Sequence, residues 1–119
     1  MLNDGTGFKK VYLATGSMDL RRGIDGLART IWFQFQLDPY DKNTLFLFCG
    51  KRTDRIKGLI WEGGFLLLYK RIENGNFRWP RTQEEAMEIT TDQYQMLTQG
   101  LEVVARHPIE EVHDPAFSL

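Results

Sequence analysis

The stretch that decides the fold is Thr44–Pro80, TLFLFCGKRTDRIKGLIWEGGFLLLYKRIENGNFRWP. Its apolar and aromatic runs are interrupted by two glycine turns, at Glu62-Gly63-Gly64 and at Asn74-Gly75. Short β-rich runs separated by such turns are the strongest local signal for β-hairpins. The stretch therefore predicts a four-stranded antiparallel meander over about 44–50, 55–62, 65–73 and 76–80.

Two-residue loops at both turns would place like charges opposite each other. Lys57 would lie opposite Lys70, and Arg71 opposite Arg78. Such pairs destabilise an isolated sheet, and a bound polyanion would relieve that cost. The alternatives are that the long basic side chains splay apart into water, or that the register differs by one residue.

Three further elements are predicted outside the meander. Lys9–Ala14 has the pattern of a short N-terminal strand. Apolar residues at helical spacing predict one long helix over about 20–36, regular from Gly23 onwards; they are Leu20, Ile24, Leu27, Ile31 and Phe35. The capping-box pattern Thr90-x-x-Gln93 predicts a short C-terminal helix over about 91–99. The predicted fold class is α+β, a mostly antiparallel sheet packed by these two helices.

The predicted meander is apolar on both faces near its first glycine turn. Trp61 and Leu66 lie on one face, and Ile60 and Phe65 on the other. A sheet of this kind must be covered on both faces. One long helix and one short helix provide little cover, so we predict a homodimer that buries Trp61, Leu66 and their neighbours.

Length and composition indicate one ordinary globular domain. The chain has 119 residues, of which 42% are hydrophobic and 26% charged. We predict a single domain over 1–104 and a C-terminal tail or arm over 105–119. The one cysteine, Cys49, lies in an apolar strand, which predicts a buried thiol and a reducing compartment. No apolar run is long enough to span a bilayer, and no secretory pattern is present, so we expect a cytoplasmic protein without membrane association.

A net charge of −1 conceals a strong asymmetry along the chain. Residues 51–81 carry eight Lys or Arg and three Asp or Glu, whereas residues 82–119 carry one and eight. Such segregation is evidence about partners rather than about fold. It permits one surface for an anion and another for a basic protein, and it also permits the acidic segment to neutralise the basic one.

Three blocks of the sequence carry a resemblance to a known family. They are VYLATGSMDLRRGIDGLA, LFLFCGKRTDRIKGLIWEGGFLLLYKRIENGNFRWP and EITTDQYQMLTQGLEV. In this order and spacing, over about Phe8–Val104, they resemble the small accessory protein of insertion sequences of the IS66 type, often called TnpB or the second-open-reading-frame protein. The resemblance implies a bacterial protein that supports DNA transposition beside a separate transposase and a sister accessory protein. It implies no catalytic residues.

Residue chemistry offers no convincing catalytic centre. Three carboxylates could hold Mg²⁺ in principle, namely Asp19, Asp54 and Glu62. The last two lie at opposite ends of one predicted strand, roughly 25 Å apart at about 3.3 Å per residue. His107 and His113 do not have the spacing of zinc ligands, and Ser17 lacks a histidine in any structured segment. We predict a protein that is not an enzyme and that needs no metal or cofactor.

The basic end of the meander is the candidate binding site. Phosphate-neutralising cations beside an aromatic ring resemble a nucleic-acid platform. The candidate residues are Lys51, Arg52, Arg55, Lys57, Lys70, Arg71, Arg78, Trp79 and Arg81. The alternative is a solvated loop with Trp79 in the core. Two functions therefore remain: a DNA-binding accessory factor, or a protein adaptor that docks the transposase or the sister protein through the acidic segment 82–119.

Overall fold

A computed structural model describes residues 8–81, 85–98 and 102–106 of the chain. The elements are β1 (Lys10–Ala14), α1 (Ile24–Arg29), the π-helical turn η1 (Thr30–Gln34), β2 (Thr44–Cys49), β3 (Arg55–Trp61), β4 (Phe65–Arg71), β5 (Ala86–Ile89), α2 (Thr91–Thr98) and β6 (Glu102–Arg106). The predicted α+β class is confirmed. No helix in the described part of the chain is long and apolar enough to cross a membrane.

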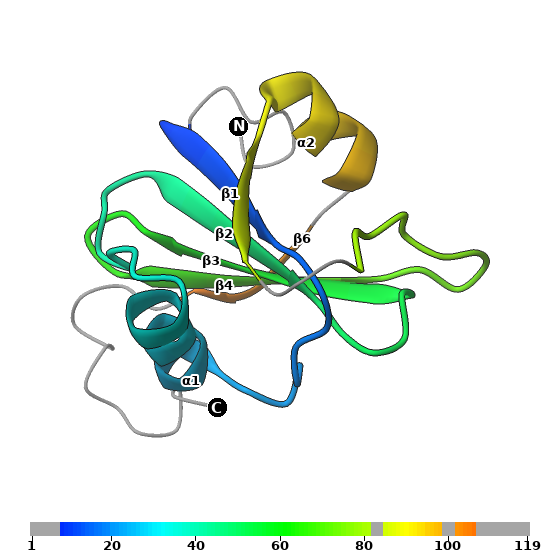
Figure 1. The fold of residues 1–119 in the computed structure, drawn as a ribbon, viewed down its shortest axis with the longest axis horizontal. Helices are drawn as coiled ribbons and strands as arrows, with labels where there is room; N and C mark the ends of the chain where they lie inside the picture. The colour runs from blue at the N-terminus through cyan, green and yellow to red at the C-terminus, as the bar shows by residue number, and fades with distance from the viewer. Residues whose placement is uncertain (1–7, 82–84, 99–101, 107–119) are drawn as a thin grey trace.

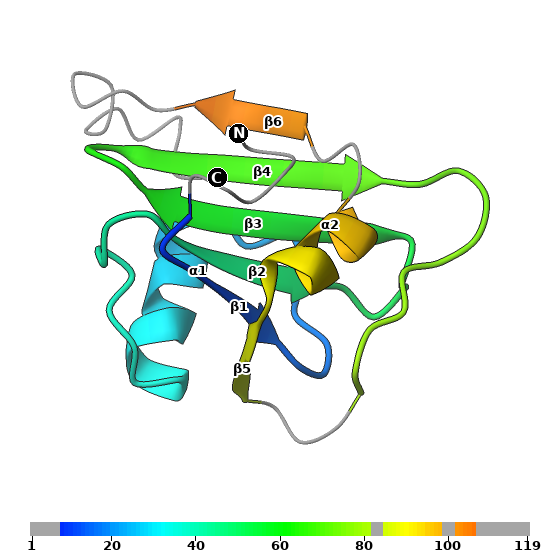
Figure 2. The same cartoon turned by 90° about the horizontal axis from the view of Figure 1, so that it is seen from above.

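The strands form one six-stranded sheet in the order β5-β1-β2-β3-β4-β6. Strand β1 is parallel to β2, because the chain crosses over through α1 between them, and the other four pairings of the described strands are antiparallel. The predicted N-terminal strand and the first three strands of the meander are therefore confirmed. Strands β5 and β6 add an edge on either side (Figure 2).

The two helices cover opposite faces of the sheet (Figure 1). The buried cluster on the α1 face consists of Ala14, Ile24, Leu27, Ile31, Phe46, Phe48, Leu59, Phe65 and Leu67. The cluster on the α2 face consists of Val11, Leu13, Leu45, Leu47, Cys49, Ile56, Ile60, Leu66, Leu68, Trp79, Ile89 and Tyr94. Both faces are thus covered within one chain.

The dimer surface predicted from the sequence is wrong. Leu66 is only 3% exposed, and Trp61 is half-buried against the rings of Tyr40 and Phe65. The prediction underestimated the cover, because the segment that carries Trp79 was expected to be a fourth strand of the meander and instead packs on the second face beside α2. Self-association itself stays a prediction.

The helix over 20–36 is shorter than predicted. It runs from Ile24 through η1 to Gln34, and Gly23 ends the preceding turn in an extended conformation (φ −95°, ψ −158°). At its C-terminus the Phe35 N–H bonds the Thr30 carbonyl at 3.2 Å, a widened π turn, and Gln36 then adopts a left-handed conformation (φ 56°). The predicted apolar stripe is nevertheless correct, since Ile24, Leu27 and Ile31 are buried and Phe35 is half-buried.

The fourth strand of the predicted meander is also wrong. Beyond β4 the chain leaves the sheet and crosses to the opposite edge, where β5 pairs with β1 (Figure 2). The Phe77 N–H donates to the Thr53 carbonyl at 2.6 Å, and the indole Nε1 of Trp79 donates to the Ala14 carbonyl at 2.8 Å. These contacts hold 76–80 against the loops at the sheet end, so Arg71 does not face Arg78.

The first glycine turn has three residues instead of two, and this changes the register. Trp61 pairs with Phe65, so that Glu62, Gly63 and Gly64 form the loop. Gly63 in this loop has φ +90°, a backbone conformation that glycine adopts readily and residues with a side chain rarely adopt. The predicted register is therefore off by one, which was the alternative stated above.

The new register separates the two lysines. Lys57 lies opposite Tyr69, and Lys70 lies opposite Ile56. Because side chains alternate along a strand, the two lysines project to different faces of the sheet. The predicted Lys57–Lys70 pair is wrong, and the like-charge pair of this hairpin is instead Arg55 opposite Arg71.

The short C-terminal helix is confirmed as α2. Its capping box is formed in both directions, since the Gln93 N–H donates to Thr90 Oγ1 at 3.2 Å and the Thr90 N–H donates to Gln93 Oε1 at 2.8 Å. Strand β6 was not predicted, and its last two residues belong to the segment 105–119, which was predicted to be a tail or arm. His107, His113 and the rest of that segment lie outside the described residues.

Candidate nucleic-acid interface

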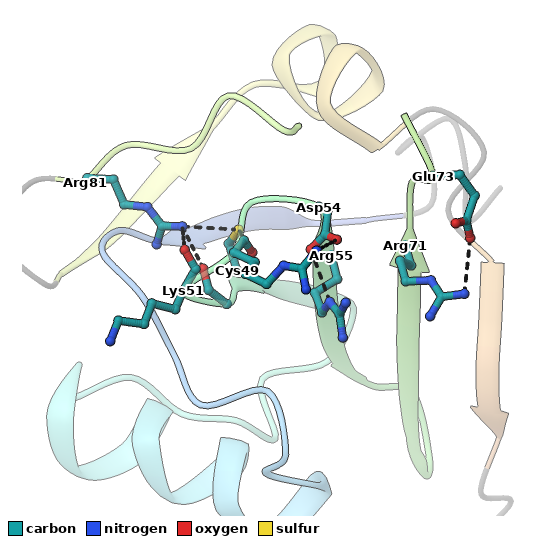
Figure 3. A network of polar contacts seen from close by, with 9 residues as sticks. Cys49, Lys51, Asp54, Arg55, Arg71, Glu73 and Arg81 are labelled. Atoms are coloured by element: carbon teal, nitrogen blue, oxygen red, sulfur yellow. Dashed lines mark hydrogen bonds and ion pairs between the residues drawn. The ribbon is translucent and has the colours of Figure 1, made fainter. Parts of the chain in front are cut away.

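The open end of the β3–β4 hairpin carries a cross-strand pair of arginines, each held by an acid. Arg55 Nε donates to Asp54 Oδ1 at 3.2 Å, and Arg71 Nη2 donates to Glu73 Oε1 at 3.1 Å (Figure 3). These ion pairs offset the repulsion that directly opposed cations would otherwise cause. The register of this hairpin therefore does not by itself require a bound polyanion.

Two loops meet beside this end of the sheet. One is the turn 17–22 after β1, and the other is the loop 50–54 between β2 and β3. They lie together because β1 and β2 are parallel, and the Met18 N–H donates to the Cys49 carbonyl at 2.8 Å. Gly50 permits a close approach, since a Cβ at this position would lie 3.1 Å from Leu20 Cδ1.

A pocket of about 570 Å³ opens between these loops and the end of the hairpin. It is lined by Ser17, Met18, Asp19, Leu20, Arg21, Gly50, Lys51, Arg52, Arg55 and Tyr69, and we call it the basic pocket. Four cationic side chains line it against one carboxylate. Its rim is accessible to a large ligand, because the side chains of Arg21 and Arg52 are 90% and 77% exposed.

The acids around the basic pocket are already engaged by arginines. Arg21 forms two side-chain hydrogen bonds to Asp19, at 3.0 and 2.9 Å, and these lower the pKa of Asp19 to about 2. The hydrogen bond from Arg55 lowers the pKa of Asp54, with a further contribution from the charge of Arg52. Both carboxylates are therefore ionised at neutral pH and orient the guanidinium groups beside the pocket.

Arg81 does not line the basic pocket but binds the backbone of the two loops that form it. Its Nη1 donates to the Gly16 carbonyl at 2.5 Å, and its Nη2 donates to the Gly50 carbonyl at 2.6 Å. The guanidinium thus joins the loop after β1 to the loop after β2. Burial raises the pKa of the Cys49 thiol above its ordinary value, and the nearby charge of Arg81 acts in the opposite direction. Arg81 positions the walls of the pocket, and its donors are turned toward carbonyl oxygens.

Two of the three predicted lysines, Lys57 and Lys70, do not line the basic pocket. Lys57 Nζ donates to the Arg22 carbonyl at 3.1 Å, and burial lowers the pKa of this lysine. Lys70 projects from the other face of β4, on the side of Leu66 and Leu68. The structure therefore divides the predicted cations between two faces instead of placing them on one.

The predicted stacking ring is not available on the surface. Trp79 is 7% exposed and belongs to the core cluster on the α2 face, which was the alternative stated above. Arg78 beside it is exposed, but it lies outside the basic pocket. Of the nine predicted residues, the structure brings together Lys51, Arg52 and Arg55 in this pocket.

Ser17, Arg21 and Tyr69 are among the seven pocket residues that the sequence prediction did not include. The first two lie in the turn after β1, far from the meander in sequence. The available signal was the parallel crossover, because a helix between two strands places the turn after the first strand beside the turn after the second. The predicted register paired Lys57 with Lys70, which placed Tyr69 on the opposite face of the sheet from Lys57; in the structure Tyr69 lies opposite Lys57.

The carboxylates near the basic pocket are not grouped as metal ligands. Across 8–81, 85–98 and 102–106, no three His, Cys, Asp or Glu side chains are grouped to hold a metal ion. The carboxylates Asp19, Asp54 and Glu62 are not assembled into one site there. What the pocket offers is fixed positive charge, a hydroxyl and an aromatic ring, which suit an anionic ligand.

The fold and this site define a small α+β protein with a mixed six-stranded sheet and a basic pocket at one sheet end. The chain belongs to the IS66 Orf2-like protein family, which matches residues 9–108. It is therefore an accessory protein of insertion sequences, associated with transposition, as the resemblance implied. The family is not a known enzyme class.

Two relatives from Sinorhizobium fredii are similar along most of their length. The uncharacterized protein y4jC is 32% identical over 104 residues, covering 85% of this chain and 88% of the relative. The uncharacterized protein y4hO is 36% identical over 103 residues, covering 85% and 86%. No solved structure matches this chain.

Proposed function

We propose that this accessory protein binds DNA through the basic pocket and supports transposition by holding the DNA of the element. The observation that carries the proposal is the convergence of four cationic side chains from two loops and one strand; these are Arg21, Lys51, Arg52 and Arg55. Phosphate contacts by such side chains supply most of the affinity for DNA and little sequence information. The expected binding is therefore strong at low salt and tolerant of sequence.

The basic pocket is locally positive although the net charge of the whole chain is −1. The chain has a net charge of −1, so its overall charge does not attract DNA. Around the pocket, however, the acids Asp19 and Asp54 are outnumbered by the cations that line it. Attraction to a polyanion would therefore be local to this end of the sheet.

Fluorescence anisotropy with a short labelled duplex tests the proposal. Lys51→Gln combined with Arg52→Gln should weaken binding to every sequence, and each lost phosphate contact should lower the slope of log affinity against log salt by about 0.9. The matched control is Arg29→Gln with Lys42→Gln, which removes the same charge from exposed positions outside the pocket. Equal effects of the two pairs, or no binding by the wild type at low salt, would reject DNA binding through this pocket.

The second candidate function is a protein adaptor, and one observation favours it. Trp32, Phe33 and Tyr40 form an exposed aromatic patch, with 53%, 75% and 55% of each residue exposed. A hollow of about 340 Å³ lies there, bordered also by Asp25 and Arg29. Large exposed apolar groups around a hollow are typical of protein-binding surfaces. The partner would be another protein of the transposition machinery, with an apolar segment flanked by charges.

The adaptor candidate is tested by capture of the element's other proteins after nuclease treatment. Trp32→Ser with Phe33→Ser should abolish the capture, whereas Met87→Ser, an exposed apolar position on β5, should not. Capture that is unchanged by the aromatic variants would exclude this surface. Capture that disappears with nuclease would show that DNA bridges the proteins.

A further inference from the structure

The basic pocket has an apolar wall that phosphate binding alone does not explain. Met18 and Leu20 come from the turn after β1, and Tyr69 comes from β4. Contacts to a DNA backbone need only cations and polar groups on an open surface. A hollow that combines an aromatic ring and two apolar side chains with fixed positive charge suits a ligand with both an apolar and an anionic part.

Tyr69 lies where the two parts of such a ligand would meet. Its cross-strand partner is Lys57, on the α1 face of the sheet, and the residue is half-buried. Arg55 projects from the same face two residues before Lys57. The Lys57 ammonium is bound to the Arg22 carbonyl, so it is turned toward the neighbouring turn. Tyr69 therefore lines the pocket from the same face of the sheet as Arg55.

The size of the pocket matches a small organic group. Its volume of about 570 Å³ falls within the range of small-molecule sites, roughly 300–1,000 Å³. A single nucleotide offers a flat base for the tyrosine and a phosphate for the cations. A base inside a duplex cannot present its face, because both faces are covered by neighbouring base pairs, whereas an unpaired base can.

We infer that the basic pocket binds one unpaired nucleotide, with its base against Tyr69 and the side chains of Met18 and Leu20, and its phosphate on Lys51 and the arginines. The inference rests on the proposed DNA binding and names the kind of DNA that the pocket takes. Its ligand is a single-stranded end or an overhang. Recognition of this kind is tolerant of sequence, since every base has a face that can stack.

Three labelled probes test the inference in fluorescence anisotropy with the full chain. They are a short blunt duplex, the same duplex with a short unpaired overhang, and the same overhang built from abasic nucleotides. The abasic probe keeps the phosphates and lacks the bases. We expect the overhang with bases to bind about five- to a hundredfold more tightly than the abasic overhang, the gain that stacking of a base supplies.

Variants of Tyr69 test whether the preference for the overhang with bases arises in this pocket. In Tyr69→Leu the ratio of the two overhang affinities should fall to about one, and in Tyr69→Phe, which keeps the ring, it should be retained. The ratio is measured within each variant, so a general change in affinity cancels. The wild-type ratio decides the inference even if Tyr69→Leu fails to fold.

The outcomes separate the inference from the proposed function. Equal binding of all three probes overturns the unpaired-nucleotide site and leaves DNA binding intact. A preference for bases that persists in Tyr69→Leu overturns the placement of the base in this pocket. Failure of every probe to bind at low salt rejects DNA binding, and the inference is rejected with it.

Discussion

The two ends of the β3–β4 hairpin are built from different interactions. At the turn end, Trp61 pairs with Phe65 and Leu59 with Leu67, and the rings of Trp61 and Phe65 pack at 5.0 Å between centroids. At the open end, Arg55 lies opposite Arg71, and each is held by a neighbouring acid. One hairpin thus has an apolar end and a charged end.

The difference shows how a small protein can expose a dense group of cations without losing its fold. Burial of apolar side chains at the turn end and under both helices contributes stability in proportion to the area removed from water. Exposed ion pairs contribute little, and they are sensitive to salt. The charged end is therefore free to bind a ligand, whereas the apolar end maintains the register that places the cations.

The largest loss of stability is expected from a truncation at the apolar end of the β3–β4 hairpin. Leu59→Ala removes a side chain that is 0% exposed, and such truncations cost about 2–5 kcal/mol of unfolding free energy. Urea unfolding followed by circular dichroism measures the loss. Lys57→Ala is the matched control, because Lys57 lies two residues away on the same face of β3. Equal losses of unfolding free energy in Leu59→Ala and Lys57→Ala would mean that the apolar end does not contribute more to stability than the charged end.

The next largest loss of stability is expected in the segment 76–80, which carries Trp79. Trp79→Phe removes the buried hydrogen bond from the indole Nε1 to the Ala14 carbonyl, which costs about 1–3 kcal/mol. The control is Trp32→Phe, at a residue that is 53% exposed. Equal shifts in the urea midpoint for the two variants would show that this hydrogen bond does not hold the segment in place.

A smaller effect is expected at the turn that sets the register. Gly63 has φ +90°, and a residue with a Cβ in a left-handed conformation costs roughly 1–2 kcal/mol. Gly63→Val should therefore lower the melting temperature clearly. Gly63→Asn should lower it less, because asparagine tolerates this conformation better. Similar melting temperatures for the two variants would argue against a left-handed residue here.

The smallest effect is expected from the acids of the charged end. Because the hydrogen bond from Arg55 lowers the pKa of Asp54 in the folded state, the ionised carboxylate stabilises the fold above its ordinary pKa of 3.8. This contribution is lost as the pH falls through the lowered value. Wild type should therefore melt slightly above Asp54→Asn at neutral pH, and the gap should close in acid. A gap of constant size down to strongly acidic pH would contradict the assignment.

Local patterns predicted the elements whose causes are local. The stripe Ile24, Leu27 and Ile31 predicted the helix that covers the sheet, and the Thr90–Gln93 capping box predicted the start of α2. The strands β2, β3 and β4 followed from their composition and the glycine turns between them. These features depend on residues close together in the chain.

The errors came from choices that local patterns leave open. The sequence Glu62-Gly63-Gly64 is compatible with a two-residue or a three-residue loop, and the choice moves every side chain of β4 to the other face. Packing decided it, because the observed register places Leu66 and Leu68 in the cluster on the α2 face and Leu67 in the cluster on the α1 face. The Asn74-Gly75 turn failed as a hairpin signal because Trp79 is held by Ala14 on a distant strand.

The sequence by itself determined the α+β class, the family and the basic character of residues 51–81. It also determined that Lys51, Arg52 and Arg55 lie in one loop and the strand after it. Only the tertiary structure decided that Arg21 and Tyr69 join them, that Trp79 is buried and that Lys70 faces the other side. The physical reason is that these relations depend on a parallel crossover and on one hairpin register. Both are selected by the burial of apolar side chains across the whole sheet.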